Sequence, residues 1–437
     1  MRSTLTRLTL KAALLSDSNQ LLRLNSDIRD AGIELSKVQE RIKDDPSYRE
    51  KHFTDRIPRI HSLQKKLDNK TAILSWHLSP GKLLALVITG NQFSHVETGI
   101  NQDFYAKLDS FKILLQQTGE QSPRLNYLSS TLSEILVGPI SSKLQHMNRL
   151  IIIPDDELYY LPFEALQDEN RHYLVEKYSV LYQFSTALLD RDEKNKNAGG
   201  ILAIAPFASR SYIDSSGYEL KALPASREEV SDLPGMILLD SIGTRENFLR
   251  AADKYGIIHL ATHASADNEI PQRSFIAFYP DQPNFKLYAG EIYNMRLDST
   301  ELIILSACET GSGQLIKGEG LMSLSRAFAY AGCPNIITSL WKAEDKTTSY
   351  ITQRLHHYLE KGLSKDKALQ KAKQDLMEDD AIDPRFKSPN YWAHLLLIGD
   401  YEPRPAAYPW WWIAAGLLLG SAIYLISKKK RSKQSNH

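Results

Sequence analysis

The chain has 437 residues, 42% of them hydrophobic and 24% charged, which allows roughly three domains at about 150 residues each and excludes a disordered, collagen-like or polytopic membrane protein. Since 53 Lys and Arg balance 52 Asp and Glu, the chain as a whole lacks the positive charge that favours nucleic acid, and we expect no nucleic-acid partner. The two cysteines, Cys308 and Cys333, exclude a disulfide scaffold and a metal site built from a cysteine cluster.

Residues 1–70 are predicted to form a helical segment. Apolar side chains recur here at steps of four and three residues, a spacing typical of a coiled coil or a helical repeat, at Leu24, Ile28, Ala31, Leu35, Val38 and Ile42. Pro46 and Pro58 interrupt the pattern. The segment is too short to show a repeat period, so the remnant of one or two helical repeats is one interpretation of it.

From Leu74 onward, short apolar runs alternate with longer amphipathic stretches. The predicted strands are Leu83–Ile88, Leu150–Ile153, Ile201–Ala205, Ile257–Ala261, Phe275–Phe278, Leu302–Ser306 and Asn335–Leu340. The predicted helices are Phe104–Leu144, Ser226–Leu233, Arg245–Tyr255, Leu321–Ala331, Thr347–Lys361 and Lys365–Glu378, with a polar linker at 191–200. This alternation predicts an α/β fold, a mostly parallel sheet flanked by helices, with its functional site at the carboxyl ends of the strands.

Two of these strand ends carry residues suited to nucleophilic catalysis. His263 follows one strand, Cys308 follows the next, and the two are 45 positions apart, close to the spacing of the caspase pair. An imidazole beside a thiol can take its proton, and backbone N–H groups can hold the oxyanion that forms. We therefore predict Cys308 as nucleophile, His263 as general acid and base, and the N–H groups of Ala264 and Cys308 as oxyanion donors. Alone, either side chain would more often be a packing residue, as we expect for Cys333.

The chain from 74 to 402 resembles the CHAT domain, a caspase-like peptidase family that often lies beside tetratricopeptide repeats. The matching motifs are PDDELYYLPFEAL (Pro154–Leu166), HLATHA (His259–Ala264), LSACETG (Leu305–Gly311), GEG (Gly318–Gly320), SLW (Ser339–Trp341) and YWAHLLLIGD (Tyr391–Asp400). The resemblance implies that His263 and Cys308 are the catalytic pair, and that Ala264 stands where the family usually has glycine.

The resemblance also implies that the loop after SLW lines the substrate pocket. Asp345, or Glu344 in its place, would then meet a basic side chain of the substrate. The alternative for Asp345 is a helix N-cap, since a helix is predicted to begin just after it.

Metal and nucleotide cofactors are not expected. Gly313 and Gly318 have the glycine spacing of a phosphate-binding loop, but Glu319 stands where that loop needs lysine. The adjacent His356 and His357 lack the pattern of a zinc protease, and a cysteine–histidine pair needs no metal.

The C-terminal part of the chain predicts a membrane anchor. No charged residue occurs between 405 and 427, and three consecutive tryptophans from Trp410 begin an apolar run of 17 residues. We predict a single transmembrane helix at 408–427 and a basic tail at 428–437, the alternative being a buried core helix. The positive-inside rule places the tail in the cytoplasm, but residues 1–30 show no clear export signal, so the side of the catalytic domain stays open.

Together these features predict a membrane-anchored, caspase-like cysteine endopeptidase. It would cleave a protein or peptide substrate, with a protein partner as a possible activator and membrane lipid around the C-terminal helix. Two alternatives remain: a non-catalytic CHAT scaffold that docks a partner at the membrane, and a membrane receptor whose basic tail binds anionic lipid.

Overall fold

The structure is a computed structural model that describes residues 20, 24, 27–31, 58–117, 122–190, 199–213, 219–267, 271–281, 284–306, 320–341 and 344–400. Residues 20, 24 and 27–31 are helical, and the next described helix is α4 (Ile60–Lys66). The predicted membrane helix at 408–427 lies outside the described residues. Within the described ranges, no helix is both long and apolar enough to cross a membrane.

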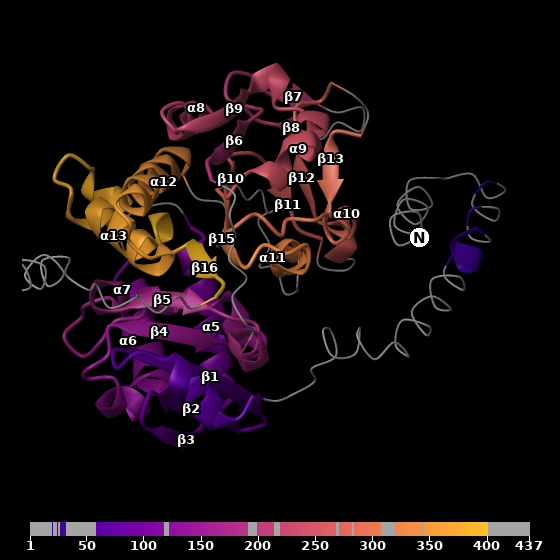
Figure 1. Cartoon of the computed structure of the whole chain (residues 1–437). Helices are drawn as coiled ribbons and strands as arrows, with labels where there is room; N and C mark the ends of the chain where they lie inside the picture. The colour runs from indigo at the N-terminus through magenta and orange to yellow at the C-terminus, as the bar shows by residue number, and fades with distance from the viewer. Residues whose placement is uncertain are drawn as a thin grey trace, which may run out of the picture. The chain divides into compact units, whose positions relative to one another are not determined.

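The described strands form an 11-stranded sheet, which Figure 1 shows from β3 at one edge to β9 at the other. Its order is β3 (Phe93–Gly99), β2 (Lys82–Thr89), β1 (Thr71–Ser79), β4 (Arg149–Ile153), β5 (Ser179–Tyr182), β16 (Leu395–Ile398), β15 (Asn335–Ser339), β14 (Leu302–Leu305), β10 (Ile257–Leu260), β6 (Ile201–Ala205) and β9 (Gly235–Leu239). Two smaller sheets contain β11 (Ala264–Ser265), β12 (Phe275–Ala277) and β13 (Lys286–Tyr288), and β7 (Tyr212–Ile213) and β8 (Glu219–Leu220).

The large sheet is mostly parallel, as predicted, but its two halves run in opposite directions. Strands β1, β4, β5 and β16 are parallel to one another, and so are β15, β14, β10, β6 and β9. The halves meet where β16 pairs with β15 in antiparallel register, with Leu397 opposite Ile337. Strands β1, β2 and β3 add an antiparallel meander at one edge. The carboxyl ends of one parallel set therefore lie beside the amino ends of the other set.

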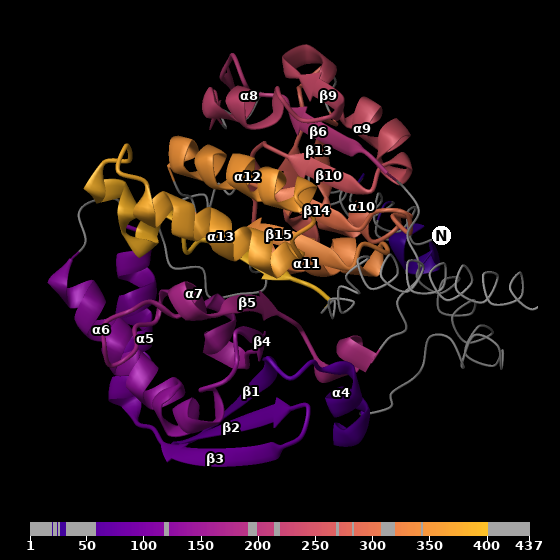
Figure 2. The ribbon, with the colours of Figure 1, turned by 60° about the vertical axis from the view of Figure 1, so that its left-hand side comes forward.

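Helices cover both faces of the half that contains β10 and β14. Because successive strand residues point to opposite faces, Ile258 and Ile303 pack with α9 (Arg245–Ala251), α10 (Ala289–Ile292) and α11 (Gly320–Tyr330). Ile304 instead belongs to the apolar cluster that includes α12 (Asp345–Glu360) and α13 (Lys365–Glu378), and Ala203 packs with α8 (Ala225–Val230). Figure 1 shows α12 and α13 on one side of β10 and β15, with α9 to α11 on the other, and Figure 2 shows α12 and α13 side by side.

The remaining helices lie with β1 to β5 and in the connections. They are α5 (Gln102–Leu115), α6 (Pro123–Leu136) and α7 (Leu174–Lys177). The 3-10 helices are η1 (Gly138–Lys143), η2 (Asp156–Tyr160), η3 (Phe163–Ala165), η4 (Thr186–Asp190), η5 (Asp240–Ile242), η6 (Ala252–Lys254), η7 (Pro271–Arg273), η8 (Pro384–Lys387) and η9 (Pro389–Tyr391).

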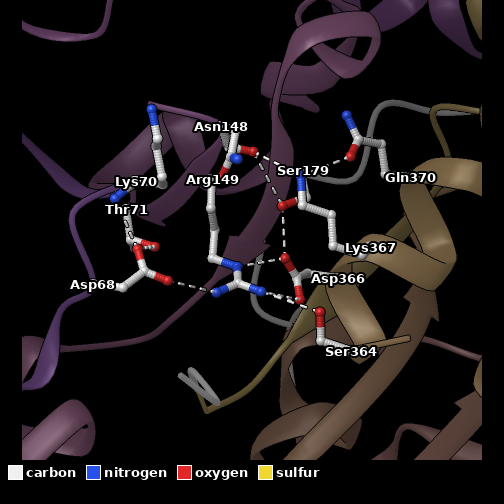
Figure 3. A network of polar contacts seen from close by, with 10 residues as sticks. All are labelled: Asp68, Lys70, Thr71, Asn148, Arg149, Ser179, Ser364, Asp366, Lys367 and Gln370. Carbon is white, nitrogen blue, oxygen red and sulfur yellow. Dashed lines mark hydrogen bonds and ion pairs between the residues drawn. The ribbon is translucent and has the colours of Figure 1, made fainter. Parts of the chain in front are cut away.

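A buried ion pair ties α13 to β4 and β5 (Figure 3). Arg149 Nε donates to Asp366 Oδ2 at 2.6 Å and Nη2 donates to Oδ1 at 3.2 Å, while Ser179 Oγ donates to Asp366 Oδ2 at 2.6 Å. The two charged side chains are 5% and 6% exposed. These contacts join three segments that are far apart in the sequence, and they hold the last long helix against the first half of the sheet.

Candidate active site

His263 lies just beyond the carboxyl end of β10 and is 2% exposed. Its ring packs against Phe207, with the ring centroids 4.9 Å apart, and its Nε2 lies 2.6 Å from the backbone oxygen of Lys221. A carbonyl oxygen can only accept, so Nε2 carries the proton and donates it. In the neutral imidazole the lone pair is therefore on Nδ1, the atom that would take a proton in acid–base chemistry.

The strand that precedes Cys308 is the neighbour of β10. Strands β10 and β14 pair in parallel, with Leu260 opposite Leu305. His263 stands three positions beyond Leu260, and Cys308 stands three positions beyond Leu305. The described residues end at Ser306 and resume at 320, so Cys308 lies outside them, and the pairing with His263 stays a prediction.

Ala264 opens β11 and is 1% exposed. Because Ala277 N–H donates to His263 O at 2.8 Å, His263 and Ala277 are a hydrogen-bonded pair, and Ala264 and Ile276 are the adjacent non-hydrogen-bonded pair. The N–H of Ala264 therefore points away from β12. Ala264 is not among the described non-glycine residues with positive φ, so alanine fits this backbone where the family usually has glycine.

The two predicted substrate-binding acids both accept hydrogen bonds from backbone N–H groups. Glu344 is the N-cap of α12, and its Oε2 accepts from Thr347 N at 2.9 Å. Asp345 is the first residue of α12, but its Oδ2 accepts from Ala225 N at 2.9 Å, at the start of α8. Burial raises the pKa of Asp345, an effect that the hydrogen bond from Ala225 partly offsets. A role for either acid in substrate binding stays a prediction.

Cys333 is the cysteine that the structure describes, and it is fully buried. It belongs to the apolar cluster beneath α11, and its Sγ lies 3.3 Å from Asn335 O. Its environment is that of a packing residue, as predicted.

A buried polar cluster behind the strand ends was not predicted. His259, in the middle of β10, is fully buried; its Nε2 lies 2.7 Å from Glu229 Oε1, and its Nδ1 lies 2.8 Å from His356 Nε2. Ser306 Oγ, two positions before Cys308, lies 3.4 Å from the same Nε2. The sequence did contain a signal for this cluster, namely a histidine within an otherwise apolar strand. A buried imidazole needs hydrogen-bond partners, so such a histidine indicates other polar side chains nearby.

Other features of the described residues carry no predicted role. A groove of about 920 Å³ is lined chiefly by α6, η1 and residues 167–178, and none of His263, Ala264, Glu344 and Asp345 lines it. Across the ranges that the structure covers, no group of three or more His, Cys, Asp or Glu is arranged to hold a metal ion.

Comparison with known proteins identifies the family. Residues 127–400 match the family model of the CHAT domain, which is more than half of the chain, and the chain therefore belongs to the CHAT domain family. Tetratricopeptide repeat protein 28 of Mus musculus is 22% identical over 326 residues, and that of Homo sapiens is 22% identical over 324 residues. Each alignment covers 62% of this chain but 13% of the relative, so the chain spans only a small part of these proteins.

Two solved structures were also found to be similar. The separase–securin complex of Saccharomyces cerevisiae has a TM-score of 0.47 at 12% identity, over 89% of this chain and 35% of that chain. The Arg-specific cysteine proteinase gingipain R has a TM-score of 0.39 at 12% identity, over 68% of this chain and 75% of that chain.

Proposed function

We propose that the chain is a membrane-anchored, caspase-like cysteine endopeptidase with Cys308 as nucleophile and His263 as general acid and base. The observation that carries the proposal is the pairing of β10 with β14. Neighbouring parallel strands have their carboxyl ends side by side. His263 follows Leu260 by three residues, and Cys308 follows Leu305, the residue opposite Leu260, by three residues as well.

The chemistry follows from the proton positions at His263. The Lys221 carbonyl keeps the proton on Nε2, so Nδ1 accepts the proton of the Cys308 thiol as the sulfur attacks the scissile carbonyl carbon. The C–N bond then breaks, and His263 returns the proton to the leaving amine. Water hydrolyses the thioester to regenerate the thiol. The Ala264 N–H, which points away from β12, supports a role as one donor to the oxyanion.

Asp345 and Glu344 are proposed to select a basic side chain immediately before the cleaved bond. Burial raises the pKa of Asp345, so its charged form would be stabilised by a cation placed beside it. Reversing the charge with Asp345→Lys or Glu344→Lys should lower kcat/KM for basic substrates only at the acid that contacts the substrate. A preference for acidic or apolar residues at that position would remove both acids from the role.

The segments outside the described residues complete the proposal. The apolar run at 408–427 would hold the enzyme in a membrane as a single-pass anchor. A protein partner is proposed as an activator, because a glycine-rich segment follows Cys308, with Gly311, Gly313, Gly318 and Gly320, and such segments often need ordering before a pocket forms.

Matched cysteine variants test the enzyme. Cys308→Ala should abolish both cleavage of a peptide library and labelling by a thiol-reactive peptide probe, whereas Cys333→Ala, at the buried packing cysteine, should leave both nearly intact. Cleavage that survives Cys308→Ala would contradict the mechanism. No cleavage by the full chain under any condition, with or without candidate partners, would favour the non-catalytic scaffold.

A further inference from the structure

The buried cluster of Glu229, His259 and His356 joins three elements behind the candidate site. His259 comes from β10, Glu229 from α8 and His356 from α12, and their side chains are 0%, 3% and 3% exposed. The two imidazole rings are stacked, with centroids 5.0 Å apart. Glu229 and His356 thus contact His259 from the face of the sheet that α8 and α12 cover.

One arrangement of protons that satisfies the whole cluster has Glu229 as an acceptor and both imidazole rings neutral. The Glu229 oxygen accepts from His259, so the proton of His259 is on Nε2 and its Nδ1 is an acceptor. His356 Nε2 then donates to that Nδ1. Burial lowers the pKa of His356 well below its usual value, which fits a neutral His356 ring.

Stability alone gives little reason for this cluster. Buried polar networks cost desolvation, and apolar residues of similar volume often replace them without loss of stability. The two helices also have apolar contacts of their own, since Val230 of α8 and Ile351 and Leu355 of α12 are fully buried. The polar cluster instead fixes the orientation of the His259 ring, because hydrogen bonds constrain the orientation of a side chain more than apolar packing does.

The cluster reaches both strand ends that carry the proposed dyad. His259 stands four positions before His263 on the same strand and its continuation. Its Nε2 is 3.4 Å from Ser306 Oγ, and Ser306 N donates to Leu260 O at 3.2 Å. Ser306 is the last described residue before Cys308.

We propose that His259, held by Glu229 and His356, is a positioning residue that fixes the ends of β10 and β14 relative to each other and so sets the geometry of His263 and Cys308. Because this role concerns the dyad, it rests on the function proposed above. Misplacement of a catalytic group by about 1 Å can lower a rate by about 100-fold, so a small shift at these strand ends would be measurable.

The test uses the full-length chain and replaces the whole cluster by apolar residues, in Glu229→Leu/His259→Val/His356→Leu. The rate at which iodoacetamide alkylates Cys308 is measured against pH by mass spectrometry, which separates Cys308 from the buried Cys333. In the wild type the midpoint should lie below the ordinary thiol value of about 8.5, and His263→Ala should raise it. The cluster variant should fold with an unchanged or higher melting temperature, yet its midpoint should rise and its kcat should fall by about 10- to 100-fold with little change in KM.

Controls keep the outcomes distinct. The matched control is Glu164→Gln/Lys373→Met, which alters a buried ion pair, 3.0 Å apart, between η3 and α13, and it should leave the Cys308 profile unchanged. If the wild-type profile depends on His263 but the folded cluster variant keeps it, the positioning role is wrong and the dyad stands. If the wild-type profile is ordinary and indifferent to His263→Ala, the dyad itself is wrong. Should the triple variant not fold, Glu229→Gln carries the same test, with a smaller rise expected.

Discussion

Replacing Arg149 by methionine should destabilise the fold strongly, although the residue is remote from β10 and β14. The change removes two charge-assisted hydrogen bonds, at 2.6 and 3.2 Å, from a carboxylate that is 6% exposed. Removing one partner of a buried pair typically costs about 3–5 kcal/mol, because the other charge stays buried without compensation. Ser179 still donates to Asp366 at 2.6 Å, so we expect a loss near the lower end, about 3 kcal/mol at pH 7.

The loss should depend on pH with a defined sign. Burial raises the pKa of Asp366 in the wild type, but the charge and hydrogen bonds of Arg149, with those of Ser179 and Ser364, more than offset it, so the pKa lies below its usual value. Without Arg149, burial dominates and the folded-state pKa rises above the unfolded value of about 3.9. The folded variant then binds a proton more readily than the unfolded chain, so its deficit should shrink as pH falls from 7 towards 5.

Urea unfolding of the full-length chain, followed by far-ultraviolet circular dichroism, measures this prediction. Arg149→Met/Asp366→Asn should recover most of the lost free energy, with a coupling of about 2–3 kcal/mol in the double-mutant cycle. Arg385→Met is the matched control, since it breaks an ion pair whose arginine is 61% exposed, and it should leave the midpoint unchanged. A deficit below about 1 kcal/mol, or one equal at pH 5 and pH 7, would refute the reasoning.

Three further predictions concern other parts of the chain. Burial lowers the pKa of His394 to about 3. Between pH 7 and pH 5 this histidine therefore becomes protonated in the unfolded chain but stays neutral in the folded chain. Between pH 7 and pH 5 the free energy of unfolding of the wild type should therefore fall by about 2 kcal/mol more than that of His394→Gln. His95→Gln, at an exposed histidine, should behave as wild type. An equal fall in wild type and His394→Gln would contradict this prediction. Ala264→Gly should cost about 0.5–1 kcal/mol of stability and change kcat/KM by less than about threefold, because the position has negative φ; a larger gain in activity would show that alanine impairs the oxyanion site. A chain that ends at Pro403 should remain in the supernatant, whereas the full chain should need detergent; release of the full chain by alkaline carbonate would refute a membrane span at 408–427.

The sequence predicted the elements whose local pattern is strong. Strand β6 and helix α13 match the predicted ranges Ile201–Ala205 and Lys365–Glu378, since one is a continuous apolar run and the other has regular helical spacing. Five strands of the large sheet were not predicted, and they are β1, β3, β5, β9 and β16. The apolar residues of the edge strand β3, Phe93 and Val96, are three positions apart and do not alternate, and β5 has four residues. Hydrophobic periodicity therefore does not distinguish either strand from a loop.

For the candidate site, the sequence predicted that His263 and Cys308 follow strands, but not the side-chain contacts around them. Apolar runs before His263 and Cys308 placed both residues after strands, and the pairing of β10 with β14 places those strands side by side. The contacts that surround His263 and His259 could not be predicted, because they depend on tertiary packing. The bonded oxygen of Lys221 is 42 positions from His263, and His356 is 97 positions from His259. The sequence allowed Asp345 as the N-cap of α12, but Glu344 is that N-cap. Asp345 instead accepts a hydrogen bond from Ala225 N, at the start of α8.

The place of β16 in the sheet has a consequence for folding. Strand β16 is the last described strand, and it fills the gap between β5 and β15; Gln183 and Gly399, which are bonded there, are 216 positions apart. At about 5–20 residues per second, a ribosome needs roughly 10–40 s to add that stretch after β5 has been made. Until then the apolar β5 has an open edge, and open edges invite pairing with other chains. Nascent chains should therefore be most prone to aggregate in this interval, which gives the first half of the sheet the strongest need for a chaperone.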